Sequence, residues 1–335
     1  MKKTIGIVGA GSWGTALAVL LANNGHDVTV WSYNSSEVLE LSHSFENKRK
    51  LPGVIIPSSV SFTDDVAFAV KNKDVVITVV PSIHIKNTAK LIAPYISEEQ
   101  VIVNASKGID SKTLMTISEQ IQTEIPNVQV AVLSGPSHAE EVGKGLPTTC
   151  VIGAENESVA KALQEIFMSD VFRVYTSTDI VGIEVGASLK NVIALAAGIA
   201  DGLGYGDNTK AALITRGIAE ITRLGIKMGG KPETFAGLAG IGDLIVTCAS
   251  QHSRNRRAGV LIGQGYSAED AMKEVNMVVE GVYSARAALA LSKRYDESMP
   301  IVEQINEVLF NNKNPEVAVK ELMLRDCRPE HQNLR

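Results

Sequence analysis

Cysteine is scarce in this chain of 335 residues, and its three copies, Cys150, Cys248 and Cys327, lie far apart. An odd number at such spacing excludes a disulfide framework and a pair of cysteine metal ligands. The six histidines are also scattered, without the spacing of metal ligands. We therefore expect a protein of a reducing compartment that works without a metal.

The chain also has no excess of positive charge and no long uncharged apolar run. Its formal net charge is -5, whereas a nucleic-acid-binding surface needs a basic balance or stripe. The most apolar stretch, residues 180–200, contains Glu184, Lys190 and Asn191, and charges at that depth are costly in lipid. The first apolar run breaks at Gly9, too early for a signal peptide. These absences predict a cytoplasmic protein that neither binds nucleic acid nor inserts into a membrane.

Apolar sequence is plentiful, with hydrophobic residues at 45%, which is enough for a sizeable core. The length suggests about two domains, at roughly 150 residues per domain. In the first half, apolar β-branched runs alternate with helical spacing, which is typical of a mostly parallel sheet covered by helices on both faces. The expected strands are residues 4–8, 28–31, 74–80, 101–103, 128–133 and 171–175, and the first helix is 13–24.

Strand signals become rare near residue 180, where helical spacing replaces them. The expected helices are residues 180–200, 209–224, 267–274, 281–294 and 299–310, and residues 237–250 are expected to open as a loop into a helix. The fold class that follows is an α/β N-terminal domain with a doubly wound sheet, followed by an all-α C-terminal domain. We expect residues 1–178 to form the first domain and residues 179–335 the second.

A glycine-rich loop follows the first expected strand. Residues 9–14 read Gly-Ala-Gly-Ser-Trp-Gly and open the first helix. In this context Gly9 allows a tight turn, Gly11 lets the backbone approach a pyrophosphate, and Gly14 lets helix and strand pack closely. The helix N-terminus adds N–H donors and partial positive charge. The motif therefore predicts a Rossmann-like dinucleotide-binding domain rather than an empty glycine turn.

The residues after the second strand bear on the choice of coenzyme. Folds of this type that prefer NAD usually carry Asp or Glu there, but residues 31–34 are Trp-Ser-Tyr-Asn. No arginine stands there to bind a 2′-phosphate. The cations at residues 48–50 either fold back to this position or form a solvated loop, and we favour the solvated loop. We expect NADP(H) as the cofactor, with NAD(H) tolerated.

Two lysines are candidates for chemistry. Lys107 follows the expected strand 101–103, at the edge where a doubly wound sheet binds ligands, so it either binds an anion or is an ordinary surface lysine. Lys190 lies among small and apolar residues. It either faces a polar cavity and exchanges protons, or it forms a buried salt bridge for which Glu184 is a candidate partner.

A second polar group follows in the helical half. Asp243 and Thr247 are spaced to share a helical face, although Asp243 also suits a helix N-cap. Residues 253–257 contain three arginines, which either grip a phosphate or form an exposed basic face. His138 is interpreted as structural or solvated rather than as a general base.

In their order along the chain, these segments resemble the bacterial-type NAD(P)-dependent glycerol-3-phosphate dehydrogenases. The resemblance rests on the glycine loop, Ser106-Lys107-Gly108, residues 133–139 (Leu-Ser-Gly-Pro-Ser-His-Ala), residues 185–191, Arg254-Asn255 and residues 279–281. One such motif is weak evidence, but the ordered set is specific and spans nearly the whole chain.

The resemblance implies hydride exchange between sn-glycerol 3-phosphate and dihydroxyacetone phosphate with NAD(P), and a supply of glycerol 3-phosphate for phospholipid synthesis. It implies that Lys190 transfers the proton, that Lys107 stabilises charge on the substrate oxygen, and that Arg254 holds the phosphate. It also implies that Asn191 and Asp243 orient Lys190 and compensate its charge. Further implied substrate contacts are Gly135, Ser137, Asn191, Asp243, Ser253 and Asn255. Implied cofactor contacts are Gly9, Gly11, Ser12, Trp13, Gly14, Tyr33, Lys107, Ala139, Arg254, Val278 and Glu280.

The same resemblance makes residues 1–178 the NAD(P)-binding domain and residues 179–335 the helical substrate-binding and catalytic domain. Many members carry His or Arg at the position of Tyr33, and this departure weakens the expected recognition of a 2′-phosphate. Whether the chain forms a homodimer is left open.

Two other functions stay open. A β-hydroxyacid dehydrogenase of related architecture also joins a dinucleotide domain to a helical domain with a lysine. The arginine cluster and Gly135-Pro136-Ser137 favour a phosphorylated substrate instead. A non-catalytic dinucleotide-binding redox sensor would need no proton donor, and Lys107, Lys190 and Arg254 argue against it.

Overall fold

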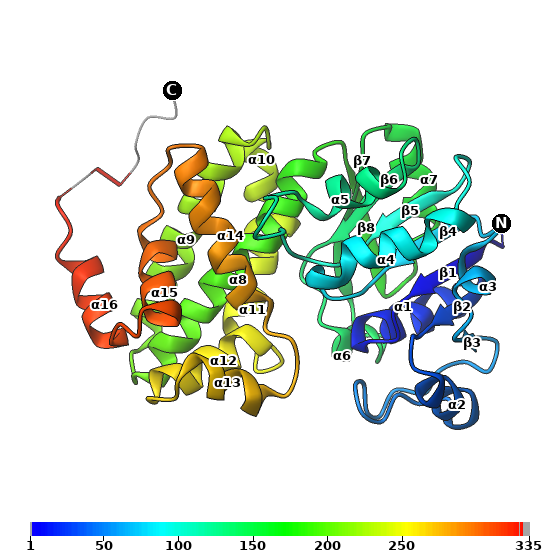
Figure 1. The fold of residues 1–335 in the computed structure, drawn as a ribbon, viewed down its shortest axis with the longest axis horizontal. Helices are drawn as coiled ribbons and strands as arrows, with labels where there is room; N and C mark the ends of the chain where they lie inside the picture. The colour runs from blue at the N-terminus through cyan, green and yellow to red at the C-terminus, as the bar shows by residue number, and fades with distance from the viewer. Residues whose placement is uncertain (1, 328, 331–335) are drawn as a thin grey trace. The chain divides into compact units, whose positions relative to one another are not determined.

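A computed structural model describes residues 2–327 and 329–330 of the chain, which divides into two compact units (Figure 1). Unit 1 is Met1–Lys107 with Met115–Glu184, and unit 2 is Gly108–Leu114 with Val185–Arg335. The expected division into residues 1–178 and 179–335 stays a prediction.

Unit 1 is built on an eight-stranded sheet of order β3-β2-β1-β4-β5-β6-β7-β8. The strands are β1 (Thr4–Val8), β2 (Asp27–Trp31), β3 (Ser61–Thr63), β4 (Val75–Thr78), β5 (Val101–Asn104), β6 (Gln129–Ser134), β7 (Thr148–Ala154) and β8 (Phe172–Ser177). Neighbouring strands are parallel except β6 and β7, which are antiparallel. The order of the first six strands is that of a dinucleotide-binding fold, which confirms the expected doubly wound sheet.

Two apolar cores cover the two faces of this sheet. Because successive strand side chains point to opposite faces, Ile5 and Ile7 enter one core while Val8 enters the other. The first core includes residues of α1 (Ser12–Asn23), α6 (Ala139–Val142) and α7 (Glu157–Phe167). The second core includes residues of α3 (Val66–Val70), α4 (Ile85–Ile92) and α5 (Ile117–Glu124). The sheet is therefore buried on both sides, and its strand ends are left for binding.

The strands β3 and β7 are absent from the sequence-based prediction. β3 is a three-residue strand at the edge of the sheet, too short to show periodicity. β7 begins with Thr148-Thr149 and contains Gly153, and glycine inside a strand weakens its signal. Pairing with β6 and β8 decides the conformation of β7.

The elements of unit 2 in the described part of the chain are helices. They are α8 (Ile180–Gly202), which begins in unit 1, α9 (Asp207–Lys227), α10 (Pro232–Phe235), the π-helix η3 (Leu238–Gly242), α11 (Asp243–Ala249), α12 (Arg254–Gly263), α13 (Ala268–Val275), α14 (Glu280–Arg294), α15 (Pro300–Phe310) and α16 (Pro315–Met323). This confirms the all-α class of the second half. α10, α12 and α16 lie outside the expected helices.

α8 is the apolar centre of the helical half. Among the described residues it alone is long and apolar enough to span a membrane, but 89% of its most apolar window is buried within the protein. Glycines let α12 approach it at backbone distance: a Cβ at Gly198 would overlap the Arg256 carbonyl, and a Cβ at Gly259 would overlap the Leu195 carbonyl. A buried core helix accounts for this stretch, as expected.

Candidate functional site

The glycine loop joins the carboxyl end of β1 to the first turn of α1, as the motif predicts. Gly9 has a φ of +125°, which glycine adopts at least cost. A Cβ at Gly14 would clash with the carbonyl oxygen of Gly9, so helix and loop touch there. Gly11 has no protein atom within 4 Å of its Cβ position and provides no side-chain cap to α1. This open backbone beside a helix N-terminus fits a pyrophosphate.

Lys50 folds back onto this loop. Its ammonium donates to the Ala10 carbonyl at 3.3 Å and forms an ion pair with Glu37 in α2 (Ser35–Ser44). The Glu37 carboxylate also accepts from the Ser32 hydroxyl at 2.6 Å. The solvated-loop interpretation is therefore wrong for Lys50, while residues 48–49 are exposed. Glu37 was not predicted as a carboxylate near the cofactor, because it lies in α2 and not at the end of β2.

The carbonyl of Gly135 brings two other predicted residues together. It accepts from Lys107 Nζ at 3.2 Å and from the Ser137 hydroxyl at 3.1 Å. Gly135 has a φ of +143°, and a Cβ there would meet the Cα of Cys150 at 3.0 Å, so glycine is required. A cation thus lies near the carboxyl ends of β5 and β6, the edge where doubly wound sheets bind ligands.

The remaining cofactor candidates of unit 1 differ in exposure. Ser12 and Trp13 are half-buried in the first turn of α1, and Ala139 is buried at the start of α6. Tyr33 is 82% exposed. His138 is the N-cap residue of α6, and its side chain makes no capping hydrogen bond; its structural interpretation stays a prediction.

Lys190 forms a buried ion pair with Asp243. Its Nζ lies 2.5 Å from the carboxylate, and the two side chains are 6% and 2% exposed. Thr247 accepts a hydrogen bond from Lys190 Nζ at 2.5 Å and donates to the Asp243 carbonyl at 2.6 Å. The suggested pairing with Glu184 is wrong, because the helical period puts Glu184 and Lys190 on different sides of α8. Asp243 is the first residue of α11 and not its N-cap.

Close packing of η3 on α8 places Asp243 beside Lys190. A Cβ at Gly186, about one turn before Lys190, would meet the carbonyl oxygen of Ala239 at 2.8 Å. The chain of η3 therefore runs against the backbone of α8 and continues directly into α11. The i, i+4 spacing of Asp243 and Thr247 was the signal in the sequence, and the ion pair agrees with the implied role of Asp243 in orienting Lys190.

A second network joins α8, α12 and the start of α14. Asn255 donates from Nδ2 to Asn191 Oδ1 at 2.9 Å, and its Oδ1 accepts from the Gly281 N–H at 2.8 Å. Both asparagines are buried. Arg254 donates to the Val278 carbonyl at 3.2 Å, and Glu280, the first residue of α14, follows that segment. These predicted residues therefore lie together.

The arginine run divides into residues of different environment. Arg256 is paired with Asp201 through Nε at 2.7 Å and through a terminal nitrogen at 2.6 Å, so it links α12 to α8. Arg257 is exposed. The Ser253 hydroxyl caps α12 by accepting the Arg256 N–H at 3.2 Å. Arg254 is thus the member of the run that joins the network at Val278.

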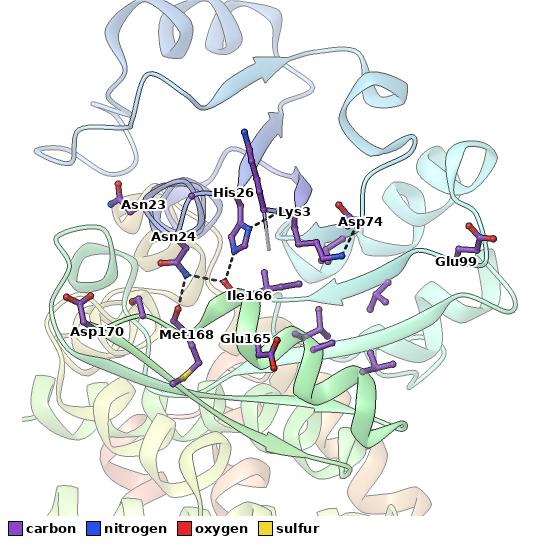
Figure 2. A pocket seen from close by; sticks show the side chains of 18 residues that line it. Lys3, Asn23, Asn24, His26, Asp74, Glu99, Glu165, Ile166, Met168 and Asp170 are labelled. Atoms are coloured by element: carbon purple, nitrogen blue, oxygen red, sulfur yellow. Dashed lines mark hydrogen bonds and ion pairs between the residues drawn. The ribbon is translucent and has the colours of Figure 1, made fainter.

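A cavity of about 980 Å³ lies elsewhere in unit 1, at the amino ends of β1 and β4 (Figure 2). The Asn24 side chain there donates to the carbonyls of Ile166 and Met168 at 3.1 and 3.2 Å. His26 accepts the Lys3 N–H at 3.2 Å. These polar groups tie α1 and β1 to their neighbours, and the cavity is at the opposite edge from the glycine loop.

Metal-ligating side chains do not cluster within residues 2–327 and 329–330: no group of three or more His, Cys, Asp or Glu there could hold a metal ion. Cys248 follows Thr247, and burial raises the pKa of its thiol to about 12. That thiol stays protonated at neutral pH.

Comparison with known proteins agrees along the whole described chain. Residues 4–160 match the family model of the NAD-dependent glycerol-3-phosphate dehydrogenase N-terminus, and residues 179–320 match that of its C-terminus. A glycerol-3-phosphate dehydrogenase [NAD(P)+] of Agathobacter rectalis is 60% identical over 330 residues, covering 98% of each chain. That of Bacillus subtilis is 51% identical over 337 residues, covering 100% of this chain and 97% of the other. The crystal structure of glycerol-3-phosphate dehydrogenase from Coxiella burnetii superposes with a TM-score of 0.93 at 39% identity, covering 97% of this chain and 99% of that one.

Proposed function

The chain belongs to the family of NAD-dependent glycerol-3-phosphate dehydrogenases, and from this premise we propose that it interconverts sn-glycerol 3-phosphate and dihydroxyacetone phosphate with NAD(P). It is an oxidoreductase of the NAD(P)-dependent class. The observation that carries the proposal is the buried Lys190 ammonium, held at 2.5 Å by both Asp243 and Thr247. Such a group can deliver a proton at a fixed position.

The cofactor is NAD(P), and the glycine loop is the part of the chain that fits it. When bound, this cofactor supplies or accepts the hydride. We propose that Gly9, Gly11 and Gly14 admit its pyrophosphate to the N-terminus of α1. Ser12, Trp13, Tyr33, Lys107, Ala139, Arg254, Val278 and Glu280 are the further proposed cofactor contacts. The Lys50–Glu37 pair beside the loop presents one cation and one carboxylate, and this supports use of both NADPH and NADH.

The lysines carry the proton and charge chemistry of the proposal. In the reducing direction the carbonyl oxygen of the ketone gains negative charge as the carbon is reduced. Lys190 donates a proton from Nζ to that oxygen and takes it back in the oxidation. Asp243 and Thr247 orient the ammonium, and the carboxylate compensates its charge in the buried site. Lys107 stabilises the charge that develops on the oxygen.

The substrate phosphate is assigned to Arg254. A guanidinium offers a rigid fork of donors that matches two phosphate oxygens. Its neighbours in the run are less suited, because Arg256 is engaged by Asp201 and Arg257 is exposed. Gly135, Ser137, Asn191, Ser253 and Asn255 complete the proposed set of substrate contacts.

Several finer points belong to the same proposal. We assign cofactor binding to residues 1–178 and substrate binding with proton transfer to residues 179–335. The enzyme acts in the cytoplasm, is not inserted in a membrane, and supplies glycerol 3-phosphate for phospholipid synthesis. A homodimer is a further option, which the mass of the protein in solution tests.

One assay tests the function. Purified protein is mixed with dihydroxyacetone phosphate and either NADPH or NADH, and cofactor oxidation is followed by absorbance. We expect turnover with both cofactors and weak turnover with dihydroxyacetone, which lacks the phosphate. Cofactor binding without any turnover of the phosphorylated ketone would overturn the assignment. Equal turnover of the two ketones would favour a hydroxyacid-type enzyme that does not recognise phosphate.

A further inference from the structure

The connection between β5 and α5 carries Lys107, and it is held near both of its ends by one carboxyl group. That group is Glu184, which lies in α8 and is 3% exposed. Its Oε1 accepts from the Asn104 side-chain amide at 3.1 Å, where β5 ends. The same oxygen accepts from the Ser118 backbone N–H at 3.0 Å, in the first turn of α5. Glu184 therefore joins the two elements that flank the connection.

The amide of Asn104 passes this restraint to the turn before Lys107. Its Nδ2 donates to the Ser106 carbonyl at 3.2 Å as well as to Glu184, and its Oδ1 accepts the Ser106 N–H at 2.9 Å. An amide group has two N–H donors and one carbonyl acceptor, so Glu184 and Ser106 together fix which way this amide is oriented. The Ser106 hydroxyl is tied in turn to the Val80 carbonyl at 2.7 Å. This series of hydrogen bonds therefore reaches Ser106, the residue before Lys107.

Both protonation states of Glu184 can serve this purpose. Burial raises the pKa of its carboxyl from 4.5 to about 7, and hydrogen bonds from Thr116, Ser118 and Asn104 oppose that rise. An ionised and a protonated carboxyl each keep an acceptor oxygen. The bonds to Asn104 and Ser118 therefore require a side chain that is as long as Glu and carries an acceptor oxygen.

We propose that Glu184 is a positioning residue for Lys107, acting through Asn104 and Ser106 to hold the Lys107 ammonium at the Gly135 carbonyl. The inference rests on the proposed function, in which Lys107 stabilises charge on the substrate. A displacement of about 1 Å at a group that contacts the reacting atoms can cost roughly 100-fold in rate. Loss of this restraint is thus expected to lower activity without removing any contacting group.

The test compares two substitutions of Glu184 in the full chain. Glu184→Leu fills a similar volume but accepts no hydrogen bond, and we expect kcat/KM for dihydroxyacetone phosphate to fall by about 10- to 100-fold. Glu184→Gln keeps an acceptor oxygen, so kcat/KM should stay within about threefold of the wild type. Asn104→Leu should reproduce the loss with Glu184 intact, which keeps the test valid if Glu184→Leu folds poorly.

A matched control separates positioning from stability. Glu220 is also buried, its pKa is also raised to about 7 by burial, and it accepts the Ile301 N–H at the start of α15 at 3.0 Å. Its hydrogen bonds to Ile301 connect it to no residue that we propose to contact the substrate. Glu220→Leu should lower the melting temperature as Glu184→Leu does, while kcat/KM per folded protein stays at the wild-type value.

A double-mutant cycle with Lys107 tests the route. If Glu184 acts through Lys107, Glu184→Leu should cost less than about threefold in a Lys107→Met background, because coupled residues are not additive. Equal losses in both backgrounds would overturn the proposal and leave Glu184 as a cap of α5. Wild-type kcat/KM in folded Glu184→Leu and Asn104→Leu would overturn it as well.

Amide hydrogen exchange provides a readout that does not depend on activity. Peptides covering residues 104–107 should exchange faster in Glu184→Leu than in the wild type, and at the wild-type rate in Glu184→Gln and Glu220→Leu. Absence of turnover in the wild type would overturn the proposed function, and the exchange rates would still decide the positioning role. Unchanged exchange in Glu184→Leu would overturn the inference even in an active enzyme.

Discussion

The glycine loop of unit 1 and the Lys190 cluster of unit 2 are built from different parts of the chain. The loop offers backbone, and its three glycines fall within residues 9–14. The cluster consists of side chains, and Lys190 is separated from Asp243 and Thr247 by 53 and 57 positions. A backbone site is set by local conformation, whereas a side-chain site needs two helices to be packed correctly. The two regions should therefore fail in different ways when they are altered.

The largest effect is expected in the side-chain site. Lys190→Met removes the proposed proton donor, and loss of general acid catalysis should lower kcat by about 10²- to 10⁴-fold. Cofactor affinity, measured by fluorescence titration, should change little. The variant should also be less stable, since removing one partner leaves the buried Asp243 carboxylate unpaired, at a cost of about 3–5 kcal/mol.

A double variant separates these two losses. Lys190→Met with Asp243→Asn removes both charges, and the free energy of unfolding should recover much of its loss while kcat stays low. If kcat recovers together with stability, or if Lys190→Met alone keeps near-normal kcat, Lys190 is not the proton donor.

Substitution of Arg254 tests whether unit 2 recognises the substrate phosphate. A charge-assisted hydrogen bond contributes about 1.5–3 kcal/mol, so Arg254→Ala should lower kcat/KM for dihydroxyacetone phosphate by roughly 10- to 150-fold. The preference over dihydroxyacetone should shrink by a similar factor. Arg257→Ala is the matched control, because that arginine is exposed, and it should keep the preference. Equal discrimination by wild type and Arg254→Ala would place phosphate binding elsewhere.

The backbone site is tested by two glycine substitutions of opposite character. Gly11→Ala introduces a methyl group with no protein atom within 4 Å, at a φ of -75° that alanine adopts readily. We expect its melting temperature to stay near that of the wild type, while the Kd for NADPH rises by about tenfold or more. A loss of about 1.4 kcal/mol in binding free energy raises the Kd tenfold.

Gly14→Ala should reverse this pattern. Its methyl group would clash with the Gly9 carbonyl, so the protein without cofactor should melt at a lower temperature. Comparable loss of stability in both variants, measured by thermal unfolding, would show that Gly11 is not an open approach for a ligand.

The smallest effect is a pH dependence that the two units share. Burial raises the pKa of the Glu184 and Glu220 carboxyls from 4.5 to about 7. The folded state therefore holds their protons more tightly than the unfolded state. Stability from these groups is fully present below about pH 4.5 and is lost as the pH rises through about 7.

Glu220→Gln removes this loss in unit 2 without changing the shape of the side chain. The melting temperature of the variant relative to the wild type should rise between about pH 5 and about pH 8, by a few degrees, since one pKa unit corresponds to about 1.4 kcal/mol. A difference that is independent of pH would contradict a raised pKa. Glu184→Gln should give the same trend for unit 1.

Much of the fold was predictable because its signals are local. The glycine loop, β1 and α1 are contiguous, and the apolar runs of β4, β5 and β6 identify buried strands without knowledge of their partners. β7 was missed because its polar start and Gly153 form a strand only through pairing with β6 and β8. The candidate site was predicted as a set of residues. The resemblance implied that Asp243 orients Lys190, and the ion pair agrees with this, but the other pairs were not predicted.

The other pairs were missed because spacing along one helix says nothing about the neighbouring helix. Position on α8 made Glu184 a candidate partner of Lys190, whereas Lys190 is paired with Asp243 and Glu184 is bound to Asn104. The fold-back of Lys50 was the alternative that we did not favour, because a run of cations is usually solvated, and its pairing with Glu37 was not expected.

The sequence by itself determined the dinucleotide-binding loop, the change from α/β to helix near residue 180, and the family to which the chain belongs. These depend on residues that are close in the chain, where backbone conformation and hydrophobic period act directly. The tertiary structure decided that Asp243 holds Lys190, that Asn255 holds Asn191, and that Glu184 holds Asn104. These contacts join distant segments, and glycines such as Gly186, Gly198 and Gly259 permit those in unit 2 by letting helices meet at backbone distance.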